Sequence, residues 1–116
     1  MWKFRPDGDE ILTYNLEDKD IVYIQTKNSL YALNLGVTER WCFRANHEKQ
    51  LKSFKVALDR EVYILTSTEF YSLDPVDGEK NWHFSQESET MNLEVLGNGM
   101  IYVATVDSVY AFDAYS

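Results

Sequence analysis

Short apolar runs separated by polar turns are the main pattern of this 116-residue chain. The runs are rich in Val, Ile, Tyr and Phe, and many are apolar at consecutive positions, which favours strands covered on both faces. We expect no amphipathic helix, because no stretch shows a 3.6-residue period. The strands are expected at 2–5, 11–16, 21–26, 30–34, 41–44, 54–58, 61–66, 70–74, 82–84, 91–96, 101–105 and 109–113.

Three series of aromatic residues repeat along the chain with one common period. The spacings are 39 to 41 residues in the series Tyr23, Tyr63, Tyr102; Tyr31, Tyr71, Tyr110; and Trp2, Trp41, Trp82. A period near 40 with four short strands per unit is typical of a β-propeller blade. The sequence therefore predicts an all-β, propeller-type fold of three four-stranded antiparallel blades.

The order of the expected strands is offset by one strand against the blades. We expect one domain over 1–116, with a blade-completing strand at about 1–5, blades at 11–44 and 54–85, and a third blade at 91–116 without its last strand. About four blades is the lower limit of a closed propeller. Three interpretations follow: a fragment of a larger propeller, a homodimer that exchanges strands to build six blades, or an isolated arc of three blades.

Charge narrows the choice of partners. The chain has 11 Lys+Arg and 19 Asp+Glu, for a net charge of −8, and aromatic residues make up 15% of it. An acidic surface repels phosphate backbones and anionic lipids, so we expect neither nucleic-acid binding nor membrane insertion. No run approaches the roughly 20 apolar residues of a membrane-spanning helix, and we expect no signal peptide. We expect a soluble acidic domain of unknown compartment.

The turn before the third Trp resembles a known repeat. Ser72, Asp74, Asp77, Gly78 and Trp82 fall on the motif Ala-x-Asp-x-x-Thr-Gly-x-x-x-Trp, with Ser in place of Ala and Asp in place of Thr. This motif is similar to the PQQ-like, or tryptophan-docking, repeat of BamB-like proteins and quinoprotein dehydrogenases. Other matches are Ala32, Asn34 and Trp41 in the first unit, with a turn one residue shorter, and Ala111 and Asp113 in the third.

The resemblance implies a structural role for its residues. In that family the Trp ring packs against the neighbouring blade, so it implies blade docking by Trp2, Trp41, Trp82, Ala32, Ala111 and Gly78. PQQ binding by the enzymes needs eight blades, metal ligands and a signature that this chain does not have. We therefore expect no cofactor. The WD-type repeat has a similar period, but neither Trp-Asp nor Gly-His occurs here, which disfavours it.

Candidate catalytic and metal-binding residues are few. His47 and His83 have no zinc-binding spacing, and the lone Cys42 forms neither an internal disulfide nor a cysteine cluster. Asp7 and Asp9 lie in an acidic stretch without the spacing of an EF-hand loop, so a solvated turn is favoured. We expect no catalytic residues and no metal.

The function expected from these patterns is non-catalytic. We expect a protein-binding or scaffolding propeller module whose partner is unknown. Two alternatives remain open: a segment of a quinoprotein-like dehydrogenase whose cofactor residues lie elsewhere, and a sensory propeller domain of a signalling protein. Because fold alone does not imply function, these expectations rest on analogy.

Overall fold

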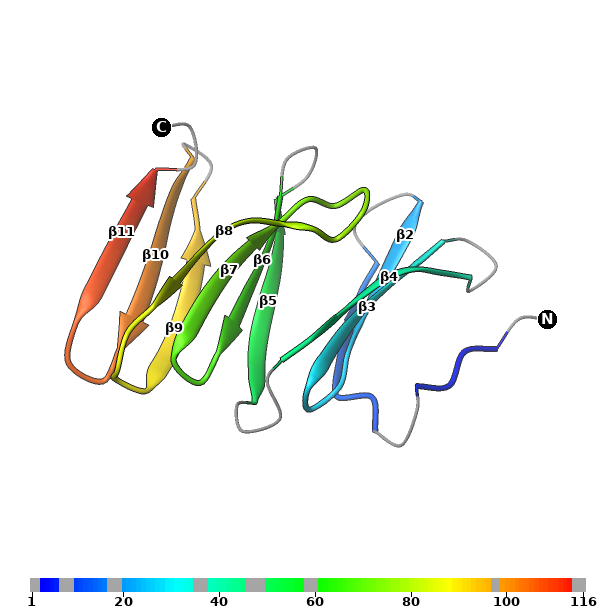
Figure 1. Cartoon of the computed structure of the whole chain (residues 1–116), viewed down its shortest axis with the longest axis horizontal. Helices are drawn as coiled ribbons and strands as arrows, with labels where there is room; N and C mark the ends of the chain where they lie inside the picture. The colour runs from blue at the N-terminus through cyan, green and yellow to red at the C-terminus, as the bar shows by residue number, and fades with distance from the viewer. Residues whose placement is uncertain are drawn as a thin grey trace. The chain divides into compact units, whose positions relative to one another are not determined.

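The computed structural model describes residues 3–6, 10–16, 20–34, 38–45, 50–57, 61–96 and 99–113. These residues form strands and turns and contain no helix, and so none of them belongs to a helix able to cross a bilayer. The eleven strands (Figure 1) are β1 (Thr13–Asn15), β2 (Ile21–Gln25), β3 (Ser29–Asn34), β4 (Glu39–Arg44), β5 (Leu51–Ala57), β6 (Glu61–Thr66), β7 (Glu69–Leu73), β8 (Lys80–Ser85), β9 (Thr90–Val95), β10 (Met100–Thr105) and β11 (Val109–Asp113).

The strands form three antiparallel sheets in which neighbours in the sequence are neighbours in space. The orders are β1-β2-β3-β4, β5-β6-β7-β8 and β9-β10-β11. The all-β class and the sheet-by-sheet repetition predicted from the period are confirmed. The segment Lys3–Pro6 is not part of any sheet, in contrast to the strand expected at 2–5. Residues in extended backbone count as a strand only when they pair, and no described strand pairs with this segment.

The chain divides into two compact units. The first contains Met1–Leu51 together with Val76–Gly78, and the second contains Lys52–Pro75 and Glu79–Ser116. In the first unit, Tyr31 and Leu33 of β3 pack with Ile24 of β2, and Phe4 and Val22 lie against them. The prediction of a single domain over 1–116 stays a prediction.

The second unit contains a core between two sheets. Tyr63, Leu65 and Phe70 of the sheet β5–β8 pack with Leu93, Ile101 and Val103 of the sheet β9–β11. Burial of large apolar side chains between facing sheets is the main stabilising contribution in such an arrangement, at about 25 cal/mol for each Å² removed from water.

The two four-stranded sheets repeat one register. Ala32 pairs with Trp41 in the first sheet and Ser72 pairs with Trp82 in the second, and the register shifts directly after Ala32 and Ser72 in both. An irregularity at the same place in both copies indicates a built feature of the repeat. The 40-residue period of the sequence is therefore a period of strand pairing as well.

A threonine at the end of each second strand fixes the following turn. The Oγ1 atoms of Thr26, Thr66 and Thr105 accept hydrogen bonds from the backbone N–H groups three residues later, at 3.2, 3.1 and 3.1 Å. Such side-chain acceptors close tight turns between strands. The turn fixes the register of the second and third strands, and hence the face to which each side chain points.

Candidate functional site

Trp41 lies against a glycine in the first unit. Gly78 adopts φ +74°, and a Cβ atom placed on it would lie 2.6 Å from Cδ2 of the Trp41 indole. Positive φ and such a close approach both require glycine. Trp41 is 7% exposed, and its ring also lies near the buried ring of Tyr23, with 6.0 Å between ring centroids. This contact has the form of the docking that the resemblance implies for Trp41 and Gly78.

Trp82 lies between aromatic rings of the second unit. Its ring centroid is 5.3 Å from that of Phe70 on its own sheet and 5.5 Å from that of Phe112 on β11. Edge-to-face and tilted pairs of this kind contribute beyond their buried area. Trp82 is partly buried, and it closes one side of a cavity of about 350 Å³ that is also lined by Ala111, Phe112 and Asp113.

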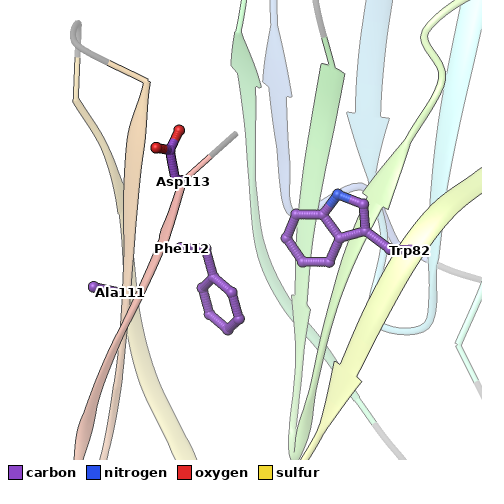
Figure 2. Close-up of a pocket in the computed structure, with 4 residues that line it drawn as sticks. All are labelled: Trp82, Ala111, Phe112 and Asp113. Carbon is purple, nitrogen blue, oxygen red and sulfur yellow. The ribbon is translucent and has the colours of Figure 1, made fainter. Parts of the chain in front are cut away.

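Figure 2 shows how the residues around this cavity are arranged. The Phe112 ring points towards the indole of Trp82, while the methyl group of Ala111 points away from it. The lining combines the two aromatic rings and the alanine with the Asp113 carboxylate, which is its charged group. A volume of this size lies near the lower end of the range for ligand pockets.

The remaining predicted docking positions differ in their surroundings. Ala32 is fully buried opposite Trp41, whereas Ala111 on the edge strand β11 is exposed. Trp2 lies outside the described residues. The blade-docking role of the whole set stays a prediction.

Ser72 occupies the motif position that holds alanine in the other two repeats, and it takes part in a polar network. The Ser72 hydroxyl donates to Oε2 of Glu61, and Asn81 Nδ2 donates to the same oxygen at 3.3 Å. The Tyr63 hydroxyl donates to Oε1 of Glu61 at 3.0 Å. Every member is satisfied by another, as partly buried polar groups require.

Sequence reasoning missed this network because it treated Ser72 as a conservative replacement for alanine. The available signal was that the second repeat differs from the first at all three of the positions that form the network. The first repeat has Ile21, Ala32 and Arg40 at the positions of Glu61, Ser72 and Asn81. We interpret the network as structural, since its members hydrogen-bond to one another across three neighbouring strands.

The other candidate side chains lie in ordinary structural surroundings. His83 is exposed and stacks on Tyr71, with ring centroids 5.5 Å apart. Lys80 also lies over the Tyr71 ring, with its Nζ atom 5.4 Å from the ring centroid. Burial, followed by the nearby Glu69, raises the pKa of Tyr71 to about 12. Within the described ranges no group of three His, Cys, Asp or Glu side chains could hold a metal ion. His47, Asp7 and Asp9 lie outside them.

Cys42 on β4 is half-buried and forms no disulfide. Burial raises the pKa of its thiol, and the Arg44 guanidinium opposes that effect. A thiol with a raised pKa is largely protonated near neutral pH, and the protonated form is a poor nucleophile. These surroundings favour a packing role for Cys42.

Comparison with known proteins supports the fold. No protein-family model and no curated protein matches the chain. Among solved structures, the WD40 domain of Neurospora crassa Pan2 matches at 18% identity and a TM-score of 0.64, covering 91% of this chain and 33% of that one. BamB from Moraxella catarrhalis matches at 19% and 0.61, covering 84% and 32%. Kluyveromyces lactis Hsv2 matches at 12% and 0.60, covering 92% and 34%.

These similarities confirm a β-propeller type of fold and leave its subclass open. The matched structures include both a PQQ-like propeller, BamB, and WD40 propellers. At identities below one fifth, the likeness concerns the fold alone. The PQQ-like identity of the repeat therefore stays a prediction. The chain spans about a third of the length of each of these matched chains.

Proposed function

We propose that this chain is a non-catalytic, protein-binding module of the propeller type. The observation that carries the proposal is a run of apolar side chains exposed on and beside β1 in the first unit. Within six consecutive residues, four large apolar side chains are exposed, namely Ile11, Leu12, Tyr14 and Leu16.

Single exposed apolar residues are common, but a contiguous group marks a surface that another molecule covers. β1 has three residues and is the edge strand of its sheet, and an edge strand is a common site of pairing with another chain. An aromatic ring such as Tyr14 supplies a large contact area and a hydroxyl group, which is typical of protein interfaces. The run therefore favours a binding surface.

The chemistry of the surface favours protein as the partner. A net charge of −8 opposes the approach of nucleic acids and anionic membranes. Other propellers also present sheet edges and loops on their surfaces. Because fold does not imply function, their roles support the proposal only by analogy.

The proposal is tested by placing a photo-crosslinking amino acid at Tyr14 and illuminating the cells that make the protein. We expect a discrete adduct with a protein, because the side chain at 14 is exposed within the apolar run. The matched control carries the same group at Thr13, the neighbouring position on the opposite face of β1. Absence of any protein adduct from position 14, or equal adducts from both positions, would contradict a binding surface on this face.

A further inference from the structure

The first and third sheets each differ from the repeating pattern in one place. In the complete sheets an outer strand covers the third strand: β4 pairs with β3, and β8 pairs with β7. In the sheet β9–β11, the third strand β11 is itself the edge, and no described strand lies beyond it. An edge strand offers a row of backbone N–H and C=O groups for pairing.

Equivalent positions in the repeats show which side chains are exposed as a result. Val109 of β11 is 70% exposed, whereas Phe70, at the same position in β7, is 1% exposed. On the opposite face of the repeat, Tyr14 of β1 is 64% exposed, whereas Leu93, its equivalent in β9, is fully buried. The face of the third sheet that bears Val109 is thus uncovered, whereas the equivalent face of the second sheet packs against the sheet that follows it. On the first sheet Tyr14 is uncovered, whereas the equivalent face of the third sheet packs against the sheet that precedes it.

The segment Lys3–Pro6 occupies the place of an outer strand from a preceding blade. In the second unit, Phe84 of the outer strand β8 packs on Tyr110 of the next sheet, with ring centroids 4.8 Å apart. In the first unit, Phe4 packs on Tyr31 of β3 in the same way, at 5.1 Å. Phe4 and Phe84 are equivalent in the repeat, as are Tyr31 and Tyr110. The first unit therefore holds a segment at the place of an outer strand, and no described strand of this unit pairs with it.

We propose that the partner of the protein-binding surface is a second copy of this chain, whose segment Lys3–Arg5 pairs with β11 and completes the third sheet. This inference rests on the proposed function and names its partner. The registers of the complete sheets place Arg5 opposite Ser108, Phe4 opposite Val109 and Lys3 opposite Tyr110. The face of the third sheet that bears Val109 then covers the face of the first sheet that bears Tyr14.

The internal repeats favour a second copy over pairing within one chain. If Lys3–Arg5 paired with β11 of its own chain, the ring would close on the three described sheets, whereas closed propellers have about four or more blades. Two copies related by a two-fold axis supply six, and each copy gives one segment and receives one. Cross-strand contacts already seen at this register support the pairing. The Arg44 guanidinium donates to Ser29 Oγ at 3.5 Å, and Ser85 Oγ donates to Glu69 Oε2 at 3.0 Å.

Disulfide trapping tests the pairing at single-residue resolution. The variant Arg5→Cys/Ser108→Cys is made in a Cys42→Ser background and oxidised with a glutathione pair. Both positions are exposed, so the substitutions remove no core contact. Because directly opposed Cβ atoms lie about 4.5 to 5.5 Å apart, we expect a covalent dimer on a non-reducing gel.

The matched control is Arg5→Cys/Val109→Cys, in which a shift of one residue turns the second thiol to the opposite face, so that no disulfide should form. A covalent dimer from the first variant only supports the proposal. A disulfide within one chain overturns the second copy as donor, and absence of any disulfide, or equal dimer from both variants, overturns the register. Circular dichroism of each reduced variant shows that it is folded. None of these overturning results bears on the proposed binding surface, which is tested independently by crosslinking from position 14.

Discussion

Replacing Phe70 by alanine is expected to lower the free energy of unfolding by about 3 to 5 kcal/mol. Phe70 is the centre of the core of the second unit, where its ring lies 5.8 Å from Tyr63, 5.3 Å from Trp82 and 5.4 Å from Phe112. Removing it leaves a cavity between two sheets, and the paired strands on either side limit how far the site can collapse. Urea denaturation followed by tryptophan fluorescence measures the change.

The control for this substitution is Val106→Ala, an exposed apolar position in the same unit. An exposed side chain of this kind should change the stability by less than about 0.5 kcal/mol. A loss below about 1 kcal/mol for Phe70→Ala would show that the sheets β5–β8 and β9–β11 do not pack through this ring.

Replacing Gly78 by alanine is expected to cost about 3 kcal/mol, through two separate effects. At φ +74° any other residue is strained, which costs about 1 kcal/mol or more. The new methyl group would also meet Cδ2, Cγ and Cε3 of the Trp41 ring at 2.6 to 2.9 Å, and such overpacking typically costs about 1 to 3 kcal/mol.

A double-mutant cycle separates the two effects. In a Trp41→Leu background the clash is relieved, so Gly78→Ala should then cost only about 1 kcal/mol of backbone strain. Equal costs in both backgrounds would mean that the indole does not lie on Gly78, and the docking role of this pair would be lost. Thermal or urea unfolding of the four proteins gives the coupling energy.

The strands and their repetition could be predicted because they depend on local pattern. Short runs of β-branched and aromatic residues form strands almost wherever they can pair, and the spacing of Tyr23, Tyr63 and Tyr102 records the repeat directly. Strand ends were less accurate. The run at 11–16 pairs only over Thr13–Asn15, because its length depends on contact with β2.

Side-chain arrangements across strands could not be predicted. The network of Glu61, Ser72 and Asn81 joins residues up to 20 positions apart, so it depends on the register and on the face to which each side chain points. The cavity beside Trp82 likewise depends on how β8 and β11 pack. The threonine turns had a visible signal in the spacing of Thr26, Thr66 and Thr105, but their hydrogen bonds required the backbone geometry.

The subclass of the repeat depends on more than the motif shows. The Gly78 turn and Trp41 fit the tryptophan-docking pattern, yet the similar structures include WD40 propellers, whose repeats also have four short strands. Period and strand order are common to both subclasses, so they identify the architecture and not the lineage.

The mass of the unmodified chain in solution tests the central claim most directly, because it needs no substitution. The claim is that two copies complete each other's sheets into six blades. Sedimentation equilibrium over a range of concentrations should then give twice the 13.6 kDa of one chain, with monomer appearing only on dilution. A mass of 13.6 kDa at every concentration, from a protein that is folded by circular dichroism, would contradict the account.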